Sequence, residues 1–372
     1  MIEEKEERPY SDALSGQGSP IVDSGGQIPD FGADGITETV EELDLYTVQD
    51  RKRIVAGGIF FLFLVLLHVG EGFLLDIDDT VISILVTQFS VLIPSLIYMS
   101  FFKINPFKFM RFKKFHLGSA FLIPLFMLAV LPVMSLFNLI SQLFSTNIIS
   151  IRLTDVLTGG LFSSLLIVAA LPAFVEEASF RGAIYASLRG CRPVRAIILS
   201  GVMFGLMHMN FNQFMYATVL GIVMGFLLEA TGSILSTMIL HFCFNANSVI
   251  LLWALPKLYD YLGQMTGSNV NMDDILAQTS GRIPTSELLM YIAIFIPIAA
   301  VGGAFAFLLY YCIAKLNKRW YYIRFLFSKD TKLQRSSFPK PKFLSICAII
   351  GMVICFGICV LNELAVRGII SL

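Results

Sequence analysis

Ionisable side chains occur at three places within strongly apolar stretches of the chain. The adjacent carboxylates of Glu176 and Glu177 are followed by Arg181, and His208 and His241 lie in two later apolar stretches. On a helix, Glu177 and Arg181 share a face and can form an ion pair, whereas Glu176 points about 100° away from Glu177. The spacing therefore predicts one neutralised carboxylate and one free carboxylate.

The free carboxylate, Glu176, is a candidate general base. Desolvation in an apolar pocket disfavours the ionised form of a glutamate, which makes it a stronger acceptor for a proton from water. His208 could share or relay that proton. His241 and Asn245, which are four residues apart, could donate hydrogen bonds to the oxyanion of a tetrahedral intermediate. The predicted reaction is the hydrolysis of a peptide bond.

The same side chains also match a ligand set for a metal ion. Glu176, His208 and His241 form the His₂Glu combination that holds a catalytic zinc and leaves one coordination position open. The residue types are compatible with two mechanisms: glutamate alone activates the water, or a divalent metal such as Zn²⁺ binds and activates it. Both alternatives therefore stay open at the level of the sequence.

The composition requires that membrane helices position these side chains. Of the 372 residues, 56% are hydrophobic and only 15% are charged, which excludes an ordinary soluble enzyme. A membrane-spanning helix needs roughly 20 mostly apolar residues. Windows of that length predict an all-α, polytopic transmembrane helical bundle with eight or nine spans, near 54–75, 80–102, 117–139, 154–175, 194–209, 213–230, 234–255, 289–314 and 343–363.

Charge separates the chain into two regions. Residues 1–50 contain 13 Asp and Glu against 2 Lys and Arg, with few aromatic residues, so this region cannot bury enough apolar surface to fold. We expect a disordered acidic cytoplasmic arm at 1–50 and a transmembrane helical domain at 51–372. The three groups of candidate site residues fall within a core of about 150–255.

Basic residues orient the spans. They precede the first predicted span, follow the second and the fourth, and reach nine Lys and Arg in 315–342. By the positive-inside rule these segments and the N-terminus are cytoplasmic, and the polar segment 256–288 is an outer loop. We expect an integral, multi-pass protein of a bacterial plasma membrane that contacts lipid headgroups through its basic segments and binds no nucleic acid.

Helix length gives the expected depth of each group. Glu176 and His208 each lie 16 residues from a turn expected near residue 192, or roughly 24 Å along their helices, whereas His241 lies only roughly 12 Å into its own helix. Tilted helices or a thinned bilayer would have to close this difference. Close helix packing is expected where glycines recur at four-residue spacing, at Gly201, Gly205, Gly221 and Gly225.

At these residues the chain resembles the CPBP intramembrane proteases, which include CAAX prenyl endopeptidases and bacteriocin-processing or immunity proteins and are also called the ABI family. The pattern is E-E-x-x-x-R, then F-x-x-x-H, then H-x-x-x-N. It occurs here as Glu176-Glu177-x-x-x-Arg181, Phe204 to His208 and His241 to Asn245. The three elements in this order make a strong combined signal, which covers about residues 150–255.

The resemblance implies a role for each matched residue. In that family the first glutamate activates the water, which assigns this role to Glu176, with His208, His241 and Asn245 completing the site. Glu177, Arg181 and Phe204 would support it. The family is described both as metalloendopeptidases and as metal-independent glutamate proteases, so the resemblance leaves the cofactor open.

We therefore expect an intramembrane endopeptidase whose active site opens toward the cytoplasm. Its expected substrate is a membrane-associated protein or peptide, processed in the manner of a CAAX protein or of a bacteriocin or pheromone precursor. Two alternatives of other classes remain. A non-catalytic immunity or scaffold protein could keep the same residues, and a secondary transporter also places ionisable groups within the membrane, although no inverted repeat is found in the sequence.

Overall fold

The computed structural model of the protein describes most of the chain after the acidic region. The described residues are 50–75, 77–101, 105–146, 156, 159–189, 193–266, 283–327 and 344–370. The predicted disordered arm, apart from Asp50, lies outside these residues. So do parts of the predicted outer loop, at 267–282, and of the basic segment, at 328–343.

The described residues are almost entirely helical, and no strand occurs among them. Eight helices within these ranges are long and apolar enough to cross a membrane. They are α3 (Asp50–Leu74), α4 (Thr80–Phe101), α6 (Leu117–Ser141), the composite helix Leu161–Leu188, α12 (Phe211–Thr231), α13 (Ile234–Thr266), α15 (Thr285–Leu316) and α18 (Ile346–Val366). The prediction of an all-α, polytopic membrane protein is confirmed.

Three further helices are shorter. They are α5 (Pro106–Phe109), α11 (Pro193–Met207) and α16 (Trp320–Phe327). The fifth predicted span corresponds to α11, which has 15 residues and is therefore shorter than the roughly 20 residues that a span requires. This explains why eight described helices, rather than nine, are long enough to cross.

The composite helix Leu161–Leu188 changes its hydrogen-bond pattern along its length. It consists of α8 (Leu161–Ser164), the π-helical segment η1 (Leu165–Ala170), α9 (Leu171–Glu177), a second π-helical segment η2 (Ala178–Tyr185) and α10 (Ala186–Leu188). The helix extends beyond the predicted span 154–175, through Glu176 to Leu188, as the turn expected near residue 192 requires. π-Helical turns are rare and occur frequently at functional sites.

One predicted loop is partly helical. The outer loop was expected to begin at residue 256, but α13 continues through Pro256 to Thr266. The proline removes one backbone donor but does not end the helix. Apolar side chains beyond it, including Leu258 and Leu262, extend the hydrophobic segment. The polar residues after Pro256 therefore did not mark the start of a loop.

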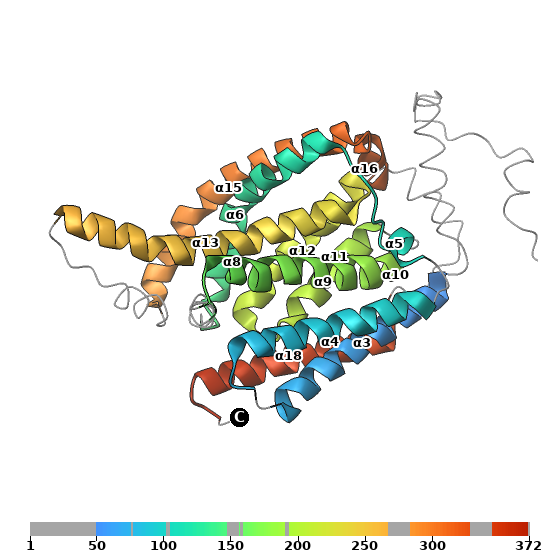
Figure 1. Ribbon diagram of the computed structural model, residues 1–372, viewed down its shortest axis with the longest axis horizontal. Coiled ribbons are helices and arrows are strands. Elements are labelled where there is room, and N and C mark those ends of the chain that lie inside the picture. The colour runs from blue at the N-terminus through green and yellow to red at the C-terminus, as the bar shows by residue number, and fades with distance from the viewer. Residues whose placement is uncertain are drawn as a thin grey trace, which may run out of the picture.

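The helices form three layers in the view of Figure 1. Helices α6 and α15 pair in one outer layer, and α3, α4 and α18 form the other. Between them lie the composite helix, α11, α12 and α13. The predicted core of about 150–255 therefore occupies the middle of the bundle, where protein on both sides can shield polar side chains from lipid.

Glycines allow α11 and α12 to approach closely, as predicted. A Cβ atom added to Gly221 would lie 2.9 Å from the Cα of Gly201, and one added to Gly225 would lie 2.8 Å from Ile197 Cγ2. Gly205 faces the backbone of Phe214 in the same way. This close packing fixes the position of Phe204, whose side chain is buried between the helices.

A buried carboxylate joins several helix ends at one side of the bundle. Glu229, near the end of α12, accepts hydrogen bonds from Tyr185 Oη at 2.6 Å, Arg189 Nε at 2.7 Å and Arg111 Nη1 at 2.9 Å. Arg319 Nε donates to the backbone oxygen of Glu229 at 2.6 Å. The predicted basic segments before α6, after α10 and after α15 therefore meet at a single acidic residue, which the sequence analysis did not identify.

We predict that Glu229→Gln strongly destabilises the protein. The substitution removes the charge that balances several buried guanidinium groups, and breaking a buried ion pair from one side typically costs about 3–5 kcal/mol. Thermal unfolding in detergent, followed by circular dichroism, measures this effect. Glu287→Gln, at an exposed position in the first turn of α15, is the matched control and should unfold like the wild type. Equal unfolding temperatures for the two variants would contradict the structural role of Glu229.

Candidate active site

The two adjacent glutamates lie at the end of α9, between the π-helical segments. Glu177 is fully buried, whereas the side chain of Glu176 is 21% exposed. Glu177 pairs with Arg181, whereas Glu176 does not, as the helical spacing predicted. The exposed carboxylate is therefore the one with access to a substrate.

Glu177 is held by two side chains. Its Oε1 accepts a hydrogen bond from Arg181 Nη1 at 2.8 Å and lies 3.1 Å from His241 Nδ1. Arg181 also donates to the backbone oxygen of Gly221 at 3.2 Å. The predicted ion pair between Glu177 and Arg181 is confirmed. The contact with His241 was not predicted, and it connects the composite helix to α13.

The hydrogen bonds assign the same tautomer to both histidines. Because a carboxylate only accepts hydrogen bonds, the proton on neutral His241 lies at Nδ1, toward Glu177. Nδ1 of His208 is 2.9 Å from the backbone oxygen of Phe204, so its proton lies at Nδ1 as well. Both rings therefore keep the Nε2 lone pair free. Nε2 of His241 lies 3.8 Å from Glu176 Oε2.

Phe204 packs against several of the site side chains. Its ring centroid lies 5.1 Å from that of His208 and 5.9 Å from that of His241, with both pairs edge to face. The guanidinium carbon of Arg181 lies 4.5 Å from the same centroid, within the range of a cation–π contact. Phe204 thus brings the three motifs of the sequence together around one aromatic ring.

The side chains expected at different depths come together in the structure, where His241 Nε2 lies 3.8 Å from Glu176 Oε2 and both histidine rings pack against Phe204. Because each π-helical turn contains more residues than an α-helical turn, the segment η2 covers less length than α-helical geometry assumes. Counting residues at the α-helical rise therefore does not give the depth of Glu176 relative to His241.

Asn245 lies one turn after His241 on α13 and already has a partner. Its Nδ2 donates to the backbone oxygen of Val168, in η1, at 3.1 Å. The sequence analysis expected this amide to face an oxyanion. A primary amide carries two hydrogens, so one remains after the bond to Val168.

Gln88 is a site residue that the sequence analysis missed. It lies on α4, and its Nε2 donates to Glu176 Oε1 at 3.2 Å. The side chain is only 8% exposed. An amide side chain in an otherwise apolar helix was the available signal, but nothing in the local sequence indicated that it would meet Glu176.

The donor atoms of the site decide whether it can hold a metal ion. Glu176 and His241 approach each other, but no group of three His, Cys, Asp or Glu side chains in the described part of the chain lies close enough together to hold a metal. The predicted zinc ligand set of Glu176, His208 and His241 is therefore not assembled in this arrangement.

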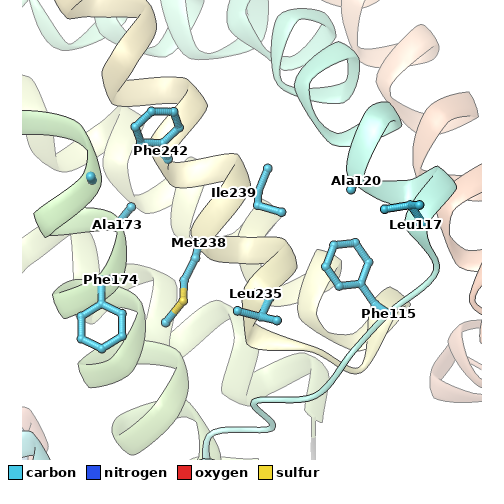
Figure 2. Close-up of a pocket in the computed structure, with 10 residues that line it drawn as sticks. Phe115, Leu117, Ala120, Ala173, Phe174, Leu235, Met238, Ile239 and Phe242 are labelled. Carbon is cyan, nitrogen blue, oxygen red and sulfur yellow. The ribbon is translucent and has the colours of Figure 1, made fainter. Parts of the chain in front are cut away.

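An apolar pocket of about 380 Å³ is lined in part by residues of α9 and α13, the helices that carry Glu176 and His241. Figure 2 shows Ala173 and Phe174 of α9 on one side, Met238, Ile239 and Phe242 of α13 beside them, and Phe115 across the pocket near the start of α6. Phe174 and Phe242 are close in sequence to Glu176 and His241, respectively. The pocket is almost wholly apolar, so it suits a hydrocarbon group better than a polar one.

A comparison with family models finds a match over the segment that contains the glutamate and histidine cluster. Residues 158–247 match the family of type II CAAX prenyl endopeptidases, Rce1-like. The match confirms the resemblance to the CPBP proteases for this part of the chain and supports a CAAX-type intramembrane protease. Neither the curated proteins nor the solved structures contain a match to the chain.

We predict that Glu177→Ala lowers the stability of the protein far more than Glu176→Ala does. The first substitution leaves Arg181 buried without its carboxylate, which typically costs about 3–5 kcal/mol. The second removes a partly exposed group and should cost about 1 kcal/mol or less. Thermal unfolding of both variants in the same detergent measures the difference, and a larger loss in Glu176→Ala would contradict the assignment.

Proposed function

We propose that the protein is an intramembrane endopeptidase in which Glu176 activates water to hydrolyse a peptide bond. The observation that carries the proposal is the different state of the two adjacent carboxylates. Glu177 is occupied by Arg181 and His241, whereas Glu176 is partly exposed and has a free histidine nitrogen 3.8 Å from its Oε2. A general base must be accessible and within reach of a water.

The proposed reaction starts with a water held by Glu176 Oε2 and His241 Nε2. Glu176 takes one proton as the water oxygen attacks the scissile carbonyl carbon, which forms a tetrahedral oxyanion. The proton can be shared with His241, because Glu177 stabilises the resulting imidazolium from the Nδ1 side. The remaining amide hydrogen of Asn245 is available to the oxyanion.

Collapse of the tetrahedral intermediate completes the reaction. The C–N bond breaks as Glu176 returns its proton to the leaving nitrogen, so that a carboxylate and an amine are released. His208, whose Nε2 is free and whose ring packs against Phe204, would receive or relay a proton at the edge of the site. Each of these steps uses only side chains of this chain and one water.

The proposed substrate is a membrane-associated protein or peptide presented from the cytoplasmic side. The basic segments meet at Glu229, and the positive-inside rule places such an end in the cytoplasm. The apolar pocket between α9, α13 and α6 would hold the hydrocarbon part of the substrate. A prenyl group next to a C-terminal C-a-a-X sequence fits this description.

We predict that Glu176→Gln abolishes cleavage while the protein stays folded, because the amide keeps the shape of the carboxylate but cannot accept the proton. The measurement compares N- and C-terminal peptides in membranes of cells that carry wild-type protein, Glu176→Gln or the exposed control Glu287→Gln. Termini present with the wild type and the control but absent with Glu176→Gln are expected, and they identify the substrate.

One outcome of this comparison would contradict the proposed activity. If all three forms accumulate to the same level and produce the same termini, Glu176 is not the base and the proposed activity is wrong. A phenotype that survives Glu176→Gln would then favour a scaffold or immunity protein, which acts by binding a partner.

A further inference from the structure

Gln88 contacts the proposed general base from outside the three sequence motifs. It lies in the middle of α4, a helix whose other residues are mostly apolar, and its Nε2 donates to Glu176 Oε1 at 3.2 Å. A buried amide in a membrane helix carries an energetic cost unless its polar atoms are paired. The side chain is therefore placed where it costs stability, and its one hydrogen bond goes to Glu176.

The other polar atom of Gln88 is left without a partner. Oε1 is buried and has no hydrogen-bond partner among the described residues. An unsatisfied acceptor of this kind in a native protein calls for an explanation. The amide therefore keeps its hydrogen bond to Glu176 while its own oxygen stays unpaired, and a role in positioning the carboxylate explains this cost in stability.

We propose that Gln88 is a positioning residue that supports Glu176 in both of its protonation states during the reaction. This inference rests on the proposed function of Glu176 as the general base. When Glu176 is ionised, the Gln88 amide nitrogen donates to it. When Glu176 has taken the proton from water at Oε2, its Oε1 is still an acceptor, so the same hydrogen bond from Gln88 persists and keeps Oε2 directed toward His241. A carboxyl group accepts a hydrogen bond in its protonated state as well as in its ionised state.

Two further contacts join α4 to the composite helix without touching Glu176. Ser95 Oγ donates to Ser179 Oγ, in η2, at 2.7 Å. Tyr98 Oη and Ser187 Oγ are 2.8 Å apart. The packing of α4 therefore does not depend on the hydrogen bond of Gln88 alone, so a variant of Gln88 can test its contact with Glu176.

Several other groups act on Glu176 and must be considered in any test of pH dependence. His241 of α13 lies 3.8 Å from its carboxylate, and Glu177 is its neighbour in sequence. Arg181 of η2, His208 after α11 and Tyr216 of α12 also interact with it electrostatically. None of them changes in a variant of Gln88, so a changed pH profile would report the loss of the amide.

The test measures kcat and KM for wild-type protein and for Gln88→Met, which keeps the length of the side chain without its hydrogen bonds. Each full-length protein is placed in liposomes with an internally quenched peptide that ends in an S-farnesylated Cys followed by three residues. We expect kcat to fall at least tenfold, with KM within twofold of wild type. Loss of a donor to the ionised carboxylate should also move the acidic limb of the kcat profile to higher pH.

Ser95→Ala is the matched control. It removes a buried hydrogen bond between the same two helices but does not touch Glu176, so kcat, KM and the pH profile should stay as in wild type. Gln88→Leu is a second apolar replacement, in case the methionine variant does not accumulate. Unfolding temperatures of all forms separate lost positioning from lost folding.

The outcomes distinguish this inference from the proposed function. A wild-type protein that cleaves the peptide while Gln88→Met retains the same kcat and the same pH profile overturns the role of Gln88 alone. An equal loss of kcat in Ser95→Ala and Gln88→Met also overturns it, because general weakening of the contact with α4 would then suffice. A folded wild-type protein that leaves the peptide uncleaved counts against the proposed activity itself.

Discussion

The arrangement of the site depends on how one fully buried carboxylate is neutralised within the membrane. A charge in such surroundings is expensive unless it is paired. Glu177 is paired on one side with Arg181 and on the other with His241. These two contacts connect the composite helix to α13, and Arg181 extends the connection to α12 through Gly221. The middle layer of the bundle is therefore held together at the same point at which the candidate site forms.

Neutralising Glu177 has a direct consequence for Glu176. Because the arginine and the Nδ1 atom of His241 are both directed at Glu177, Glu176 keeps an accessible carboxylate and faces the free Nε2 of that histidine. Glu229 shows the same principle at the end of the bundle, where a buried carboxylate orders basic helix ends. Glu177 and Glu229 thus stabilise the fold, whereas Glu176 keeps an accessible carboxylate that can act as a base.

The contacts that the sequence predicted are the local ones. The ion pair of Glu177 with Arg181 and the glycine faces of α11 and α12 follow from helical periodicity, and they are confirmed. Gln88, Glu229 and the end of α13 were missed or misplaced. Gln88 is 88 residues from its partner and Arg111 is 118 residues from Glu229. Such contacts are set by helix packing, and π-helical turns alter the depth that residue counting assumes.

The central claim is that Glu176 acts on water and does not itself attack the substrate. A single turnover with excess enzyme in H₂¹⁸O tests it most directly, with mass spectrometry of the released carboxyl group and of the peptide that contains Glu176. Our account predicts ¹⁸O in the product carboxylate in the first turnover and none in Glu176. An unlabelled first product together with ¹⁸O in the Glu176 side chain would show a covalent intermediate and contradict the account.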